Sequence, residues 1–398
     1  MSRVRRTLLW GISLLLFAVI AAAAYFYFVG TRTILEHAEA LTHQRLTVSQ
    51  LADQDAYRFF FVTNRIPDQP DGPVESWFSA DRSDALQFGS FDSEIRPTMG
   101  LGVIVDTDAW FVNEEIRLND VRMAAKNDIL EELRNQVAAS PRQSLLVVVH
   151  GFRERFPSAL RKAAFLGYIL DIDTPILVFD WPGNQGGSLG GYRRARSVAV
   201  DSGPDLAETL RTIIHDVEPK RLWLIANSMG GEVVARAFNT LATDESLADA
   251  QTEIEDVILT APDVSREKFN EKFKHDLKAL ARHTAVYVSS NDRALLASRL
   301  INREARLGES SLDPTNPAQI EEAESFSKLL EPGDDRLAMI DVTAINRTRN
   351  FHNFSLETPE FFDDLFLRLT SEGFTKSREL YDLETADGRR YFVLTRGR

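Results

Sequence analysis

Residues 224 to 238 read LIANSMGGEVVARAF, an apolar run followed by a serine and then by an amphipathic pattern. The apolar run predicts a strand and the amphipathic pattern a helix, so Ser228 lies where the strand meets the helix. Ala226 and Gly230 complete the pattern G-x-S-x-G of a nucleophile elbow, with alanine in the first glycine position. Such a turn has a cramped backbone that costs about 1 to 3 kcal/mol, and small neighbours make it possible. A serine that only caps the helix would fit the same letters, so the wider sequence has to separate the two interpretations.

Strand patterns alternate with helical patterns around this stretch. Apolar runs predict strands at residues 57–64, 100–107, 144–151, 175–183, 221–228, 256–263, 284–292 and 338–345. Helical patterns lie between them at residues 157–171, 193–216, 230–243 and 265–282. From the third run onward the strands are continuously apolar, as in a parallel sheet covered on both faces. The order predicts an α/β fold with a mostly parallel, doubly wound sheet and right-handed crossovers.

Two later segments depart from this rhythm. Residues 302–336 are polar and hold three prolines, so they could form a lid over the strand ends. The C-terminal stretch YDLETADGRRYFVLT predicts a hairpin that turns at Asp387 and Gly388.

Composition excludes several classes of function. The 398 residues carry a net charge of -13 with scattered basic residues, so a nucleic-acid partner is not expected. The chain has no cysteine, which excludes disulfides, thiolate nucleophiles and iron-sulfur clusters. No cluster of histidines has the spacing of a metal site, and the glycine-rich stretch 179–192 fits no nucleotide-binding motif. We therefore expect neither a metal nor a cofactor.

The N-terminus predicts a membrane anchor. Residues 8–29 are uncharged and nearly all apolar, which is long enough to cross a bilayer core. Three arginines lie in residues 1–7 and only Arg32 follows closely, so the N-terminus is expected in the cytoplasm and the rest outside the inner membrane. Residues 30–56 have near-helical apolar spacing and predict a helical stalk before a domain at 57–398. The alternative is a signal peptide cleaved near Ala21–Ala24, which would release the domain.

Three polar residues follow predicted strands in the order serine, aspartate, histidine. Ser228, Asp292 and His352 match the chain order of the α/β-hydrolase triad. Of the seven histidines only His352 occupies the loop after the last of the central strands, where the base of such a triad stands. We expect the acid to be Asp292, in SSNDRAL, where the fold usually supplies it, and the alternative is Asp263, in TAPDVS, which ends the preceding strand. The acid would hold the imidazole tautomer and stabilise the imidazolium.

A second loop predicts the oxyanion hole. The stretch VVVHGFRERF follows the strand at 144–149, and a His-Gly pair at that position supplies a backbone N–H to the hole. We expect the donors to be the N–H groups of Phe152 and Met229. His150 is expected to shape the loop through hydrogen bonds, with Gly151 and Gly230 as the small residues that let the loop and the elbow approach each other.

These motifs together resemble a known family. FFVTNR, VVVHGFRERF, VFDWPG, ANSMGGEVV, TAPDVSREKF, VYVSSNDRALLAS and NFHNFSL are similar to segments of the bacterial α/β-hydrolase family DUF900, over roughly residues 57 to 356. The resemblance implies a serine hydrolase fold with an esterase-like site, but it supplies no substrate. Relatives usually have His-Gly-Tyr-Asn in the first loop and often a histidine before the serine. Here Phe152, Arg153 and Asn227 stand at those positions.

The sequence thus predicts a membrane-anchored serine hydrolase. Its expected substrates are carboxylic esters or lipid acyl esters, because the anchor keeps the site near the bilayer. Two alternatives stay open: an acyltransferase, and a binding or scaffold module that has the fold without the chemistry.

Overall fold

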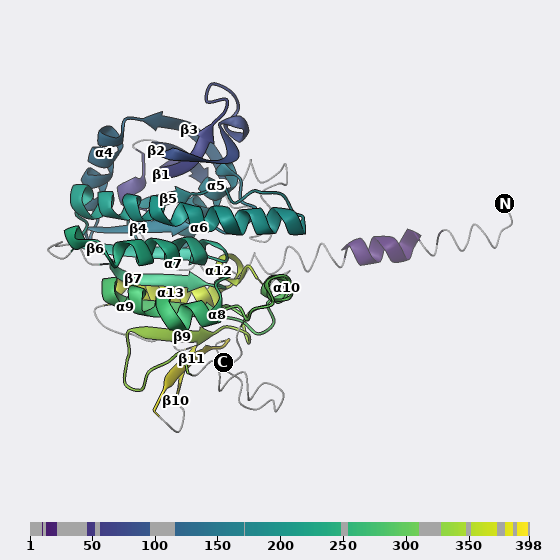
Figure 1. Ribbon diagram of the computed structural model, residues 1–398. Helices are drawn as coiled ribbons and strands as arrows, with labels where there is room; N and C mark the ends of the chain where they lie inside the picture. The colour runs from purple at the N-terminus through teal and green to yellow at the C-terminus, as the bar shows by residue number, and fades with distance from the viewer. Residues whose placement is uncertain are drawn as a thin grey trace.

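The computed structural model describes most of the chain after residue 45 (Figure 1). The described residues are 10, 13–21, 46–51, 56–95, 116–170, 172–247, 254–309, 328–347, 352–371, 379–384 and 388–396. Among them no helix is long and apolar enough to cross a membrane. Of the anchor predicted at residues 8–29, only residues 10 and 13–21 are described, and residues 22–24 of the predicted cleavage site lie outside these ranges.

One sheet of 11 strands runs through the described part of the domain. The strands are β1 (Ala56–Pro67), β2 (Phe78–Ile95), β3 (Ile116–Ala124), β4 (Ser144–Val149), β5 (Ile176–Asp180), β6 (Arg221–Asn227), β7 (Ile254–Thr260), β8 (Ala281–Val288), β9 (Leu337–Asp341), β10 (Leu380–Glu384) and β11 (Arg390–Leu394). Their order is β10-β11-β9-β8-β7-β6-β4-β5-β1-β2-β3. Neighbouring strands are parallel along the central part of this order, from β11 through β9, β8, β7, β6, β4 and β5 to β1. At the two edges, β2, β3 and β10 are antiparallel to their neighbours. The predicted α/β class and mostly parallel sheet are confirmed.

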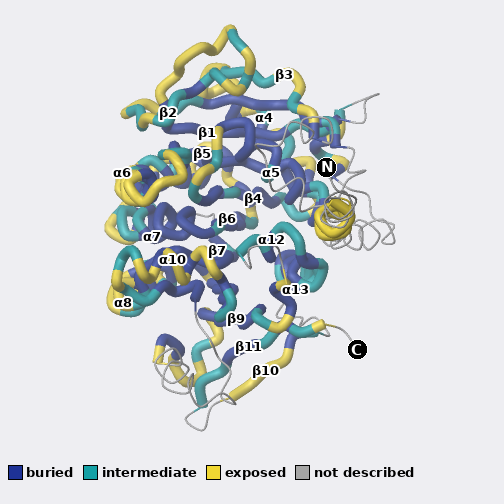
Figure 2. Tube along the Cα trace, turned by 90° about the vertical axis from the view of Figure 1, so that its right-hand side faces the viewer, coloured by how far each residue is buried: buried dark blue, intermediate teal, exposed yellow. Residues whose placement is uncertain are grey.

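Helices cover both faces of the sheet (Figures 1 and 2). One face carries α4 (Lys126–Ala139), α6 (Leu189–Thr212), α7 (Gly230–Leu241) and α9 (Lys274–Leu280), and the other carries α5 (Phe156–Leu170) and α13 (Pro359–Thr370). Side chains of β4 alternate between the two cores: Leu145 and Val147 pack on the α6 and α7 side, and Leu146 on the α5 side. Burial on both faces explains why the central strands are continuously apolar.

The sheet order reverses beside β4, and this sets the position of the site. The chain goes from β4 to β5 on one side, whereas β6 lies on the other side of β4 and leads to β7. Loops at the carboxyl ends of β4 and β6 therefore diverge and leave a crevice between them, where open α/β sheets bind ligands. The loop at Gly151 follows β4, and Ser228 follows β6.

The sequence prediction missed β2, β3, α4, α10 (Arg293–Asn302) and α13. β2 has charged and half-exposed residues along its first half, so it shows no continuous apolar run. It and β3 form an antiparallel edge of the sheet, which faces solvent in part. The strand predicted at residues 100–107 lies outside the described residues. The predicted C-terminal hairpin is confirmed, since β10 and β11 pair antiparallel.

Residues 46–49, which the prediction assigns to the stalk, pack on the domain. Leu46 is fully buried, Thr47–Ser49 forms a 3-10 turn, and the N–H of Val48 donates to Asp173 Oδ1 at 2.9 Å. Burial of an apolar side chain in the core holds this segment on the domain. Residues 30–45 lie outside the described ranges.

The start of the predicted lid is a buried brace. Arg306 and Leu307 are fully buried, the N–H of Leu307 donates to the carbonyl of Val264, and the N–H of Gly308 donates to that of Pro262. The carbonyl of Gly308 in turn accepts from the N–H of Ser289. Residues 302–309 thus join the loops after β7 and β8, whereas residues 310–327 of the predicted lid lie outside the described ranges.

The first turn of α7 packs directly on the end of β4. A Cβ atom at Gly230 would lie 2.6 Å from the carbonyl oxygen of His150 and 2.8 Å from that of Val149. Both contacts are to backbone atoms, which cannot turn aside as a flexible side chain can. Only glycine lets the elbow approach the strand this closely.

We therefore expect Gly230→Ala to lower the stability of the full-length chain by about 1 to 3 kcal/mol, the usual cost of overpacking. Thermal unfolding followed by tryptophan fluorescence measures the change. Gly190→Ala is the matched control, because its Cβ would meet nothing closer than Arg194 Nη1 at 3.6 Å. Equal melting temperatures for the two variants would contradict the close approach.

Candidate active site

Ser228 stands on a strained turn between β6 and α7. Its φ of 52° lies in the left-handed region, which non-glycine residues rarely adopt. The backbone is held on both sides: its N–H donates to the carbonyl of Thr260 at 2.9 Å, and its carbonyl accepts from Gly231 at 3.0 Å and from Asp263 at 2.9 Å. The surroundings thus impose the strain, as at functional turns. This is the geometry expected of the elbow motif.

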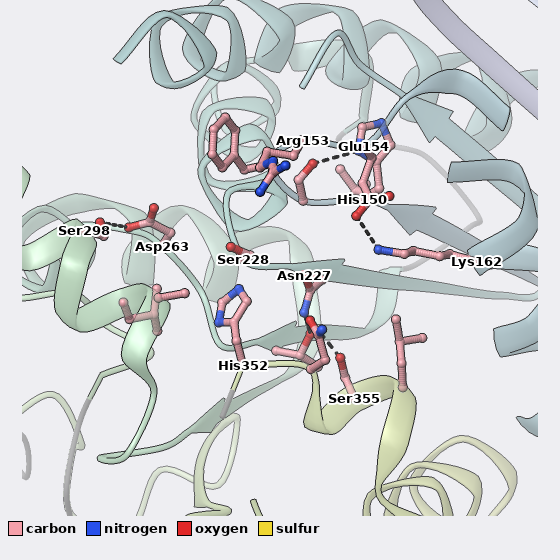
Figure 3. Close-up of a pocket in the computed structure, with 18 of the residues that line it drawn as sticks. His150, Arg153, Glu154, Lys162, Asn227, Ser228, Asp263, Ser298, His352 and Ser355 are labelled. Carbon is pink, nitrogen blue, oxygen red and sulfur yellow. Dashed lines mark hydrogen bonds and ion pairs between the residues drawn. The ribbon is translucent and has the colours of Figure 1, made fainter. Parts of the chain in front are cut away.

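His352 and Asp292 form a close pair beside this turn. The Nδ1 atom of His352 lies 2.6 Å from Asp292 Oδ2. Because a carboxylate can only accept, the imidazole carries its proton on Nδ1 and has Nε2 as its acceptor nitrogen. Figure 3 shows the imidazole next to Ser228. The other oxygen of Asp292 accepts from the N–H of Leu295 at 2.9 Å and caps α10 (Arg293–Asn302), which fixes the carboxylate in place.

Asp263, the alternative acid, makes a different set of contacts. Its carboxylate accepts from Arg306 Nε at 2.6 Å, from Ser298 Oγ at 2.6 Å and from the Tyr192 hydroxyl at 2.7 Å. It lines the same cavity as Ser228, but its hydrogen bonds go to these three groups. The structure thus brings Asp292 rather than Asp263 to the histidine.

The pKa of His352 is raised above its ordinary value. Burial opposes the charged imidazolium, but the charge of Asp292 and its hydrogen bond to the ring outweigh that effect. The charge of Asp263 raises the pKa further. The imidazole is therefore a stronger base than an isolated histidine, which suits a group that takes a proton from a hydroxyl.

Two backbone N–H groups flank Ser228. Met229 follows it on the first turn of α7, and Phe152 follows Gly151 on the loop after β4. Within the described ranges neither N–H donates to another protein atom, whereas the next donor along, the Arg153 N–H, is bound by the carbonyl of Gly183. A Cβ on Gly151 would lie 3.2 Å from Ser228 Cβ, so the loop passes directly beside the serine. Phe152 and Met229 therefore remain the predicted oxyanion-hole donors.

His150 lies below this loop in a buried polar network. Its Nε2 lies 3.0 Å from Asp180 Oδ1, and its ring stacks on Trp181 at 5.5 Å between centroids. Arg65 binds both oxygens of Asp180, at 2.7 and 3.0 Å. Burial opposes ionisation of Asp180, but Arg65 and His150 outweigh it and lower the pKa of Asp180 to about 2. His150 therefore holds the loop in place, because its ring is hydrogen-bonded to Asp180 and to backbone atoms.

A cavity of about 580 Å³ opens over Ser228. His352, Phe152 and Asp263 line it, together with apolar side chains from β4, α5, β6, α6, α10 and α12 (Phe354–Glu357). The sequence prediction missed Lys162, which pairs with Glu154 in the cavity wall (Figure 3), and Tyr192, which binds Asp263. Neither follows a strand, so no motif marked them. Across the described part of the chain, no group of three or more histidine, aspartate or glutamate residues could hold a metal ion.

The comparison with protein families agrees with the family that the motifs resemble. A family model described as an alpha/beta hydrolase of unknown function (DUF900) matches residues 125–361. No curated protein matches the chain. A proposed cell surface hydrolase from Lactobacillus plantarum WCFS1 matches at 12% identity and a TM-score of 0.33, over 59% of this chain and 95% of that one. A proposed hydrolase from Agrobacterium vitis S4 matches at 12% identity and a TM-score of 0.30, over 73% and 94%. Likenesses at these TM-scores say nothing about the chemistry of this site.

The contact between His352 and Asp292 generates a pH prediction. The imidazole of His352 should titrate above 6.5, the ordinary histidine value, and Asp292→Asn should lower that pKa because the neutral amide no longer favours the imidazolium. Asparagine keeps an oxygen to cap α10, so the helix stays in place. NMR of the chain labelled with ¹⁵N-histidine measures the titration, with the exposed Asp84→Asn as control. An unchanged pKa in Asp292→Asn would refute the pairing.

Proposed function

The chain belongs to the DUF900 family of alpha/beta hydrolases, as its motifs predicted, and from this we propose that it is a serine hydrolase that cleaves carboxylic or lipid acyl esters. The observation that carries the proposal is the convergence of three groups from separate strand ends. Ser228 follows β6, Asp292 follows β8, and His352 precedes α12 and contacts Asp292 at 2.6 Å.

In the proposed reaction, Ser228 Oγ attacks the carbonyl carbon of the ester, and His352 Nε2 takes the hydroxyl proton. The carbonyl oxygen becomes an oxyanion that accepts from the N–H groups of Met229 and Phe152. His352 then gives the proton to the leaving alcohol, which departs and leaves an acyl-enzyme. A water molecule attacks that intermediate by the same steps in reverse, which releases the acid and restores the serine. Asp292 stabilises the imidazolium throughout.

The cavity supports an ester substrate of moderate size. Its volume of about 580 Å³ lies in the range of small-molecule sites, and apolar side chains such as Leu166, Ile225 and Leu356 contribute to its wall. We also propose that residues 8–29 anchor the chain in the inner membrane with the catalytic domain outside the cytoplasm. The support for this is the uncharged length of that segment and the arginines before it.

A fluorophosphonate probe, which reacts only with an activated serine, tests the proposal. The full-length chain should be labelled, Ser228→Ala should not be, and His352→Ala should be labelled far more weakly because the hydroxyl keeps its proton. Ser188→Ala is the control, since Ser188 lines the same cavity but its hydroxyl caps α6, where it accepts from the N–H of Gly191 at 3.0 Å. A folded wild-type chain without label would overturn the proposal in favour of the binding-module alternative.

Replacement by asparagine should reduce turnover at Asp292 and stability at Asp263. Asp292→Asn should reduce the turnover of a short ester about 10⁴-fold with little loss of stability, as a tautomer-holding acid does. Asp263→Asn removes the carboxylate that binds the buried Arg306 at 2.6 Å and leaves only Glu304, at 3.7 Å, as its charged partner. Loss of one partner of a buried ion pair typically costs about 3 to 5 kcal/mol of stability. Turnover and thermal unfolding are measured on both variants. If Asp263→Asn lost turnover while keeping its melting temperature, the assignment of the acid would have to be reversed.

A further inference from the structure

Exposed leucines border the mouth of the cavity. On α10, Leu296 and Leu300 stand one turn apart with 47% and 73% of their surfaces exposed. Leu189, at the start of α6, is 50% exposed and lines the cavity itself. Large apolar side chains placed together at the surface commonly mark a site of contact with another molecule.

The two helices that carry these leucines touch each other. The Tyr192 hydroxyl of α6 lies 2.8 Å from Ser298 Oγ of α10, and the amide of Asn302 donates to Tyr192 at 2.9 Å. Figure 2 views the domain from the side on which α6 begins and α10 lies, and it shows exposed segments at both places. The leucines of the two helices therefore belong to one surface around one opening.

Arginines surround these leucines, although the chain as a whole has a net charge of -13. Residues 182–200 contain three arginines and no acidic residue, and residues 293–303 again contain three arginines and no acidic residue. Arg193, Arg194 and Arg303 are exposed, and Arg299 is exposed but pairs with Glu309 at 3.4 Å. Arg196 pairs with Glu304 at 3.7 Å, so the exposed Arg193, Arg194 and Arg303 give this apolar area its basic character on an acidic protein.

We propose that this area docks on anionic phospholipid headgroups, so that the cavity opens onto the surface of a membrane. We call it the arginine-leucine rim and define it as Leu189, Arg193, Arg194, Leu296, Leu300 and Arg303.

The chemistry of the rim suits a lipid surface. Helices that lie at a bilayer interface combine leucines, which enter the acyl boundary, with arginines, which reach the headgroups. Arginine can place its aliphatic stem along apolar surface while its guanidinium stays at the phosphates. The domain is acidic as a whole, so most of its other faces would be repelled by an anionic membrane. The positive charge of the rim therefore also determines which side of the domain faces the membrane.

The length of chain before the domain makes weak docking sufficient. Residues 30–45 separate the apolar segment 8–29 from the buried Leu46 and can span at most about 55 Å even when fully extended. A domain on such a tether is held at a high effective concentration near the bilayer, so three leucines and a few arginines suffice to orient it.

For the reaction, docking would deliver an ester from the bilayer directly into the cavity. This consequence rests on the proposed function, because it needs an ester-cleaving site. The docking itself rests on the proposed anchor at residues 8–29 but not on the proposed chemistry, since the rim leucines Leu296 and Leu300 are outside the cavity wall.

The absence of cysteine allows a direct test with the full-length chain in lipid vesicles. A single cysteine at Leu300→Cys carries an environment-sensitive fluorophore, and lipids with a shallow spin label quench it on contact. We expect strong quenching in phosphatidylcholine vesicles that contain phosphatidylglycerol and much less without it. Tyr381→Cys is the matched control, because Tyr381 is 45% exposed on β10 at the far edge of the sheet and should stay unquenched.

Charge variants show whether the arginines are responsible. Adding Arg193→Gln or Arg303→Gln to Leu300→Cys should lower the docking equilibrium roughly fivefold for each arginine removed. Equal quenching at residues 300 and 381 would overturn the proposal. Quenching at residue 300 that does not change with either arginine variant or with the phosphatidylglycerol content would overturn it as well. So would a blue-shifted and unquenched signal at residue 300, since the chain itself or a second copy would then cover α10.

Turnover separates this proposal from the proposed function. Leu296→Ser with Leu300→Ser should leave hydrolysis of a short soluble ester unchanged and reduce hydrolysis of an ester embedded in anionic vesicles roughly tenfold. An equal effect on the two substrates would contradict the docking. Absence of turnover and of probe labelling in the wild-type chain would instead contradict the serine hydrolase, while the quenching result would still stand.

Discussion

The contact between the first turn of α7 and the end of β4 holds the site together. Gly230 lies so close to the carbonyls of Val149 and His150 that no side chain fits there. This approach brings Ser228 beside Gly151, and the residues next to these two, Met229 and Phe152, are the proposed oxyanion donors. The positive φ of Ser228 is part of the same constraint, because the chain must reverse sharply from β6 to let α7 pack on the neighbouring strand.

Two buried ion pairs hold the loops around this turn. Arg65 and Asp180 brace the loops after β4 and β5, and Arg306 and Asp263 join the loop after β7 to residues 302–309. Such pairs add little net stability compared with apolar packing, but loss of one partner leaves an uncompensated buried charge. The loops are therefore restricted to the arrangement in which both pairs form, which gives the cavity a defined wall.

Asp292 connects the chemistry to the surface of the molecule. One carboxylate oxygen contacts His352 and the other caps α10, so a single residue orients the imidazole and the helix that borders the cavity. The inner side of α10 lines the cavity, and its outer side carries Leu296 and Leu300. Because Asp292 holds both α10 and His352, the rim leucines on α10 keep a fixed position relative to the histidine. A substrate that enters from a membrane at the rim would therefore reach the histidine in a defined orientation.

The sequence by itself determined the α/β class, the central parallel strands and the elbow around Ser228, because each depends on local pattern: apolar runs for buried strands, small residues for a cramped turn. It left β2 and β3 unrecognised, since strands at a partly exposed edge carry charges and lose the apolar signal. It named Asp292 as the acid but kept Asp263 as the alternative, as both follow neighbouring strands. Only the tertiary structure separated them, by bringing Arg306 from 43 positions away to Asp263 and His352 from 60 positions away to Asp292. Contacts between residues so distant along the chain depend on how the loops pack, and no local pattern records that.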